Sequence, residues 1–150
     1  MKKINQIIVD RLKGDCTRAC LASLLELDIY LVPNFIELGG GWFDSFWKFL
    51  RDNGYKYYGT GWIKSDDRPY GQILYESPNI DGLVIASVPS KTFDNIGHSV
   101  IMNLDGLVIH DPNPNKAWEE INIINCGLQH WMMIGKYDEV AEIEVKASGV

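Results

Sequence analysis

The hydrophobic and polar positions divide this chain into a helical first part and a β-rich second part. Residues 16–27 predict a helix, and its middle, residues 19–25, is apolar or small nearly all round, which predicts that the rest of the protein encloses it. In the following segment apolar side chains recur at i, i+3, i+4 and i+7, which predicts one face of a second helix that Asn53 and Gly54 end. That stripe consists of Phe43, Phe46, Trp47 and Leu50.

Short apolar runs separated by turn residues follow from residue 82 onward and predict strands. These runs are residues 82–88, 99–103, 107–110 and 129–134. Because the helices precede the strands along the chain, the predicted fold class is α+β. In this arrangement the buried N-terminal helix packs against an antiparallel sheet.

The segments outside these elements carry weaker signals. Residues 4–9 predict a short strand. Residues 31–35 predict an extended connection, because the residue before Pro33 avoids helical geometry. The three glycines at residues 39–41 predict a flexible loop. Residues 55–80 are rich in aromatic and turn residues, and no element is assigned there.

Length and charge narrow the class of protein. A chain of 150 residues is expected to form a single domain over residues 1–150, with about two thirds of its unfolded surface buried. The net charge of -6 argues against a nucleic-acid partner, which requires clustered Lys and Arg. No run approaches the roughly 20 apolar residues of a membrane span, and residues 4–10 lack the apolar core of a signal peptide. We therefore expect a cytoplasmic protein without a membrane partner.

Three residues have the functional groups that acyl-transfer chemistry requires. Cys16 lies at the start of the first predicted helix, where the helix dipole favours the thiolate. His98 directly precedes one predicted strand, and Asp111 directly follows the next. A nucleophile, a base and a group that orients the base are the parts that covalent catalysis requires. The backbone amide of Cys16 and the side-chain amide of Gln6 are candidate donors to an oxyanion.

The turn between the two strands predicts which histidine meets Asp111. Asp105 and Gly106 form a strong signal for a two-residue hairpin loop. With that loop, His98 lies diagonal to Asp111 on one face, while His110 projects from the opposite face. A loop longer by one residue would reverse this parity. The prediction therefore selects His98 and depends on the turn.

Each of these residues also has an ordinary structural explanation. A buried cysteine is commonly a small core residue, and this interpretation is favoured for Cys20 and Cys126. His98 can be a satisfied strand residue, and Asp111 can simply end a strand before a turn. Cys16 and Cys20 could hold zinc with a histidine, but the chain lacks a second close cysteine pair. We expect no metal or other cofactor.

Several segments resemble one family. Residues 14–23 resemble the cysteine box of C39-like peptidases within the papain-like superfamily, and the chain is closer still to small phage and bacterial proteins of that type. The similarity continues through residues 32–35, 42–54, 97–100 and 110–114. This resemblance implies a papain-like cysteine proteinase fold with Cys16 as nucleophile, His98 as general base and Asp111 as orienting carboxylate. Gln6 matches the glutamine that contributes to the oxyanion hole in this family.

The expected function is thiol-dependent hydrolysis through an acyl-enzyme. The bond would be a peptide, isopeptide or related amide bond, in a peptide, a protein or a small amide substrate. One alternative keeps the same triad and passes the acyl group to an amine, as a cysteine acyltransferase does. The other is a non-enzymatic papain-like protein that binds or inhibits, such as a phage product directed against a host factor. No transporter segment is present, so the double-glycine leaders of the family are not carried over as substrates.

Overall fold

The fold combines two α-helices with one antiparallel sheet, which confirms the predicted α+β class. The computed structural model describes residues 1–12, 14–62 and 78–137. The helices are α1 (Cys16–Leu25) and α2 (Trp42–Asp52), with short 3-10 helices at Ile29–Leu31 and Phe35–Gly41. The strands are β1 (Tyr55–Trp62), β2 (Leu83–Pro89), β3 (Gly97–Asn103), β4 (Val108–His110) and β5 (His130–Lys136). They form one five-stranded sheet in the order β1-β5-β2-β3-β4, and every neighbouring pair is antiparallel.

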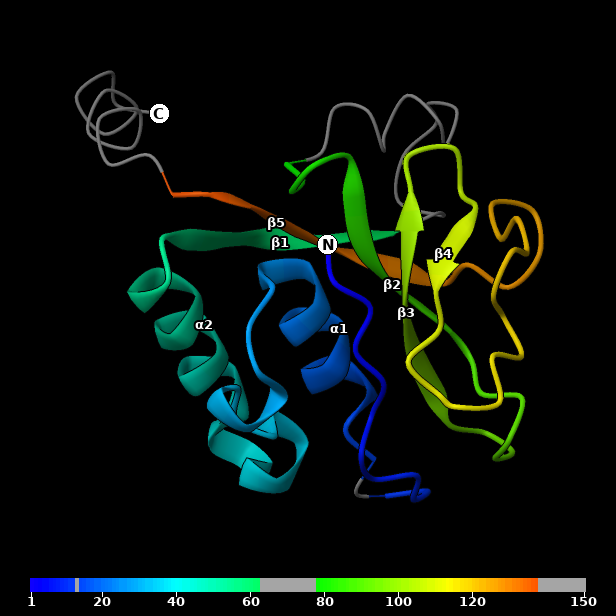
Figure 1. Cartoon of the computed structure of the whole chain (residues 1–150), viewed down its shortest axis with the longest axis horizontal. Helices are drawn as coiled ribbons and strands as arrows, with labels where there is room; N and C mark the ends of the chain where they lie inside the picture. Colours follow the sequence, from blue (N-terminus) through cyan, green and yellow to red (C-terminus); the bar gives the residue numbers. More distant parts are fainter. Residues whose placement is uncertain (13, 63–77, 138–150) are drawn as a thin grey trace.

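Both helices lie on one side of the sheet (Figure 1). Helix α1 packs against β2 and β3, and α2 packs against β1. The enclosed helix that the sequence predicted is confirmed, because almost every residue of α1 after Cys16 is buried. On the other side, Trp118, Ile123 and Leu128 from the segment between β4 and β5 complete a second apolar cluster. The sheet is therefore covered on both faces, and the first residue of α1 lies beside β3.

The ends of the two helices follow from local backbone chemistry. Helix α1 ends at Leu25 because Glu26 adopts a left-handed conformation with φ of 57°. This is two residues earlier than predicted. Helix α2 ends at Asp52, before Asn53 and Gly54, as predicted. Within its predicted stripe, Phe46 and Leu50 are buried, whereas Phe43 is largely exposed.

Two segments differ from their predictions. Residues 4–9 form no strand, because their backbone groups bond mainly to side chains from other elements and not to a neighbouring strand. Residues 39–41 belong to the 3-10 segment before α2, where Gly39 alone takes a positive φ of 65°. Of the unassigned residues 55–80, the first eight form β1, and residues 63–77 lie outside the described part of the chain.

The β3–β4 loop is one residue longer than predicted. The N–H of Asn103 donates to the carbonyl of Leu107 at 3.0 Å, which leaves three residues in the loop. The side-chain oxygen of Asn103 also accepts from the N–H groups of Asp105 and Leu107, both at 3.0 Å. These bonds stabilise the three-residue loop, with Gly106 at a φ of 88°. The two-residue turn was therefore a wrong prediction.

A β-bulge in β4 restores the parity that this longer loop would have reversed. The pairs are Met102 with Val108 and Ile101 with His110. Ile109 is the extra residue between them, so the side chains beyond it change face. Asp111 consequently points toward His98, and His110 points away from it to the carbonyl of Ile4. The predicted partnership of His98 with Asp111 is thus present in the structure.

No single helix among the described residues has the length and apolar character needed to cross a membrane. Helix α1 and Ile29–Asp52 together are long and apolar enough, but the two parts are bent by 109° at the break.

Candidate active site

Cys16 is the first residue of α1 and is partly exposed. At this position the backbone N–H groups of the first turn lack partners within the helix, and the helix dipole is positive. Cys20 lies one turn further along and is completely buried, and Cys126 is exposed in the segment before β5. Burial raises the pKa of Cys20 well above its ordinary value. Of the two cysteines in α1, Cys16 is therefore the one that can act as a nucleophile.

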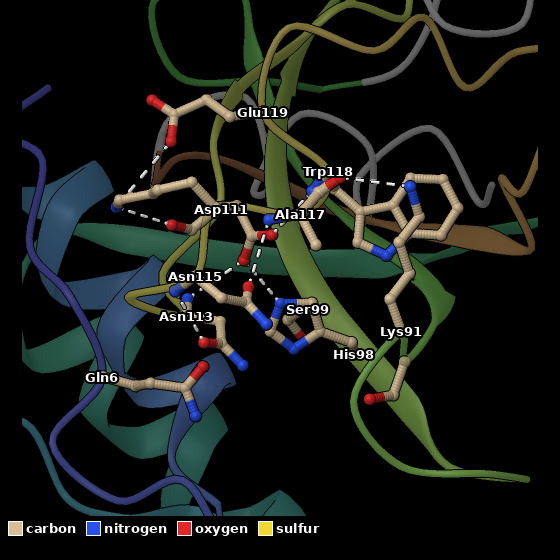
Figure 2. A network of polar contacts seen from close by, with 12 residues as sticks. Gln6, Lys91, His98, Ser99, Asp111, Asn113, Asn115, Ala117, Trp118 and Glu119 are labelled. Atoms are coloured by element: carbon tan, nitrogen blue, oxygen red, sulfur yellow. Dashed lines mark hydrogen bonds and ion pairs between the residues drawn. The ribbon is translucent and has the colours of Figure 1, made fainter.

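Asp111 is the centre of a hydrogen-bond network and orients His98 (Figure 2). Its Oδ1 lies 2.7 Å from Nε2 of His98 and also accepts from the N–H of Asn113 at 3.0 Å. Its Oδ2 accepts from the N–H of Trp118 at 3.0 Å. The carboxylate is 1% exposed, so these bonds replace the water that it has lost. The result is a fixed carboxylate that holds the imidazole in one orientation.

The imidazole of His98 also lies close enough to the thiol of Cys16 to shift the pKa of both groups. Since Asp111 engages Nε2, Nδ1 is the ring nitrogen left for the sulfur. Burial lowers the pKa of His98, but the bond to Asp111 and the contact with Cys16 raise it to about 9. Burial raises the pKa of Cys16, but the hydrogen bonds and charge of His98 and two hydrogen bonds from Ser99 outweigh it and lower the pKa. These opposite shifts favour transfer of the thiol proton to the imidazole.

Ser99 is a site residue that the sequence prediction left without a role. Its backbone N–H and its hydroxyl both help to lower the pKa of the Cys16 thiol. The same hydroxyl lies 3.0 Å from Oγ1 of Thr17, in the first turn of α1. Ser99 therefore links β3 to the start of the helix and stabilises negative charge on the sulfur. The signal for this role was its place directly after His98, on the opposite face of the strand.

Gln6 lines the same cleft as Cys16, although the two residues lie ten positions apart in the sequence. Both residues line one cleft of about 310 Å³. Nε2 of Gln6 donates one hydrogen to the carbonyl of Ile8 at 2.8 Å, which leaves its second hydrogen available. The backbone N–H of Cys16 has no acceptor within the helix. The structure thus places both predicted oxyanion donors beside the cleft.

Asp15 explains how Gln6 reaches this position. We call residues 1–9 the N-terminal segment. The carboxylate of Asp15 is fully buried and accepts from the N–H groups of Ile7 at 3.0 Å and Ile8 at 2.9 Å. It does not cap α1 with its side chain, as an aspartate at this position commonly does. The carboxylate therefore fastens the N-terminal segment to the helix start.

His110 and the turn after it fasten the same segment from the other side. Nε2 of His110 lies 2.7 Å from the carbonyl of Ile4, and burial lowers the pKa of this histidine. A neutral imidazole can donate Nε2–H to that carbonyl. The carbonyl of Pro112 accepts from the N–H of Gln6 at 2.8 Å. Asp111 and His110 are thus adjacent in sequence, but Asp111 orients His98 and His110 fastens the N-terminal segment.

Apolar side chains form part of the remaining lining of the cleft. Val9 and Leu12 come from the N-terminal side, and both are well exposed. Further apolar side chains come from the 3-10 helix before α2, from β2 and β5 and from the loop before β3, namely Ile36, Ile85, Ala86, Phe93, Ile96 and Met132. Such a surface suits an organic substrate with apolar groups. Within the described ranges, no group of three or more His, Cys, Asp or Glu side chains is placed to hold a metal ion.

The predicted residues Cys16, His98, Asp111 and Gln6 therefore lie around one cleft or directly beside it. Asp15, Ser99 and His110 are supporting residues to which the sequence prediction gave no functional role. No family model, curated protein or solved structure matches this chain.

Proposed function

We propose that this protein is a papain-like cysteine hydrolase that cleaves a peptide, isopeptide or related amide bond. One observation carries the proposal: the imidazole of His98 contacts both the thiol of Cys16 at a helix start and the buried carboxylate of Asp111. A structural histidine needs no such pair of partners. The order Cys, His, Asp along the chain and the resemblance of residues 14–23 to a cysteine box support the same assignment.

In the proposed reaction, the thiolate of Cys16 attacks the carbonyl carbon of the scissile amide. The negative charge that develops on the carbonyl oxygen receives hydrogen bonds from the N–H of Cys16 and the amide of Gln6. The imidazolium of His98 then gives its proton to the leaving nitrogen, and the C–N bond breaks to leave a thioester on Cys16. Neutral His98 next removes a proton from water, which attacks the thioester and releases the acid and the thiol.

The reactivity of Cys16 toward iodoacetamide near pH 6 tests this proposal. The protein carries Cys126→Ser, so that the exposed thiol does not contribute. We expect rapid alkylation of Cys16, because a thiolate is the reactive form, and a slower reaction in His98→Ala. His130→Ala is the matched control, since His130 also lines the cleft but is not bonded to Asp111. A thiol at Cys16 as sluggish as that of buried Cys20 would support the binding or inhibitory alternative.

A second experiment identifies the substrate and the nucleophile, water or an amine, that accepts the acyl group. Incubation with a cell extract followed by mass spectrometry distinguishes a cut product, expected for a hydrolase, from a new conjugate, expected for an acyltransferase. The Cys16→Ala variant keeps the cleft without the nucleophile and can retain substrates for identification. Wild-type and Cys16→Ala proteins that leave the same products would contradict catalysis by this residue.

A further inference from the structure

Besides the imidazolium of His98, the described lining of the cleft has one other source of positive charge, Arg11. Among the described residues that line the cleft, Arg11 is the one Lys or Arg. A neighbouring carboxylate, that of Asp10, also lines the cleft, but its Oδ1 accepts from the N–H of Leu12 at 2.9 Å in the same turn. The chain as a whole is acidic, with a net charge of -6. A positively charged guanidinium at the cleft of an acidic protein therefore suggests a role in binding.

The contacts of Arg11 leave most of its donors available. Its Nη2 reaches the backbone carbonyl of Asp94 at 3.4 Å, which is long for a charged donor. Within the described part of the chain, no carboxylate oxygen lies within 4.0 Å of its guanidinium. A guanidinium carries five N–H donors, so one long bond to a carbonyl leaves the fork free to bind an anion.

Arg18 shows how the same chain satisfies a structural arginine. It is mostly buried, and its Nε donates to the carbonyls of Ile29 at 3.0 Å and Val32 at 2.7 Å. Its Nη1 lies 3.6 Å from the carboxylate of Asp15. Arg11 has none of these features, since it is exposed and lacks a described acidic partner. The contrast indicates that Arg11 serves the cleft and not the fold.

The position of Arg11 brings its charge to a bound substrate. Arg11 belongs to the turn between the N-terminal segment and α1, which carry Gln6 and Cys16. Asp94 belongs to the loop that leads into β3 and His98. The contact between Arg11 and Asp94 therefore spans the two sides of the cleft that hold the nucleophile and the base. A substrate whose carbonyl lies at Cys16 shares one cleft with Arg11.

We propose that Arg11 binds a carboxylate of the substrate, so that the enzyme prefers amides with a negative charge near the scissile bond. The inference rests on the proposed function, since it assigns the substrate class of that same site. The guanidinium and the carboxylate form two parallel N–H···O bonds, which also fix the orientation of the substrate. A chain-terminal α-carboxylate and an acidic side chain share this chemistry.

The test compares two alkylating agents of nearly equal size in the Cys126→Ser protein. Iodoacetate carries a carboxylate and iodoacetamide is neutral, and both are attacked by the sulfur of Cys16 with loss of iodide. We expect the ratio of their rates to fall about tenfold in Arg11→Gln, as for the loss of one hydrogen bond to a charged group. Arg11→Lys should keep part of the preference. The rate with iodoacetamide, measured in each variant, is the reference that cancels any general change in the reactivity of Cys16.

Lys48→Gln is the matched control, because it removes the same charge from α2, outside the cleft. An unchanged ratio in Arg11→Gln, or an equal fall in Lys48→Gln, would overturn the role of Arg11. These outcomes leave the proposed function intact, because Cys16 still reacts rapidly with iodoacetamide. Slow alkylation by iodoacetamide in the parent protein would instead remove the proposed function itself.

Competition with short peptides identifies the source of the carboxylate. Three peptides are compared as inhibitors of Cys16 alkylation: acetyl-Ala-Ala with a free carboxylate, acetyl-Ala-Glu amide and the neutral acetyl-Ala-Ala amide. Protection by the first assigns the α-carboxylate, and protection by the second assigns an acidic side chain. Either preference should disappear in Arg11→Gln. Protection by neither acidic peptide beyond that of the neutral amide would count against the proposal.

Discussion

The two sides of the cleft are built in different ways. The side of the base consists of β3, β4 and the loop after β4, where His98 and Asp111 are 13 residues apart and lie on a continuous ladder and turn. The side of the nucleophile combines α1 with the N-terminal segment, which has no regular structure. Side chains such as Asp15 and Ser23 hold that segment through its backbone. One side thus relies on secondary structure, and the other relies on a few buried polar side chains.

This difference implies separate consequences for mutation. A change on the side of the base should act on the ionisation of the thiol and imidazole, because Asp111 contacts His98 directly. A change in the anchors of the N-terminal segment should act first on the position of Gln6 and on local stability. Measurements that separate ionisation from local opening therefore test whether the two sides are independent.

The largest effect is expected for Asp111→Asn. The amide keeps the size of the side chain but removes the charge that supports the imidazolium of His98. We expect amide hydrolysis to fall by about 10³–10⁴-fold, as for the loss of the orienting carboxylate in related triads. The pKa of His98, about 9 in the parent protein, should fall. Histidine NMR titration measures this change, and an unchanged pKa would contradict the role of Asp111.

The pH dependence of hydrolysis should reveal the same pair. The pKa of His98 is raised to about 9, so its proton is present at neutral pH and is lost as the pH rises through 9. The proton is needed by the leaving nitrogen, and hydrolysis limited by formation of the thioester should fall about tenfold per pH unit above this value. Alkylation needs only the thiolate and should continue there. A parallel fall of both rates would contradict this separation.

A smaller, local effect is expected for Asp15→Asn on the other side of the cleft. The amide is isosteric, but it cannot accept from Ile7 and Ile8 as strongly, and it loses the charge near Arg18. We expect a loss of about 1–3 kcal/mol of unfolding free energy. Hydrogen exchange at the backbone amides of Ile7 and Ile8 should accelerate, whereas the pKa of His98 should not change. Exchange as slow as in the parent protein would show that the segment is held by other contacts.

The smallest effect is expected for Ser99→Ala, at the junction of the two sides. The variant removes the hydroxyl, one of the two groups of Ser99 that lower the pKa of Cys16, and leaves the backbone N–H in place. The pKa of Cys16 should therefore rise, so that the alkylation profile shifts to higher pH. Thr17→Val is the matched control, since it removes only the hydroxyl partner of Ser99. If the pH dependence of alkylation does not shift in Ser99→Ala, the hydroxyl does not contribute and the lowered pKa of Cys16 is assigned to the backbone N–H of Ser99 alone.

Much of the regular structure could be predicted from local patterns. The apolar character of α1 on all sides predicted an enclosed helix, and turn residues separated the later strands as predicted. The run of apolar residues at 4–9 was interpreted wrongly as a strand. Periodicity reports which side chains are apolar, but it does not report which partners bond the backbone. In this segment those partners are side chains from distant parts of the chain.

The pairing of His98 with Asp111 is an instructive case. Local chemistry indicated a hairpin, yet the loop is one residue longer than the Asp105–Gly106 pair predicted. The bulge at Ile109 compensates, so the predicted face is reached although the predicted turn is wrong. A sequence pattern does not specify a bulge by itself, because its position depends on how β3 and β4 pack with the layers on both faces.

The sequence by itself determined the chemical types and the elements that carry them: a cysteine at a helix start, a histidine at one strand and an aspartate directly after the next. Only the tertiary structure decided that Gln6 and Arg11 line the same cleft as Cys16 and that Ser99 lowers the pKa of its thiol. The physical reason is the sequence separation over which each kind of interaction acts. Helix and strand propensities act over a few residues, whereas a site is completed by hydrogen bonds and charges between segments up to about a hundred residues apart.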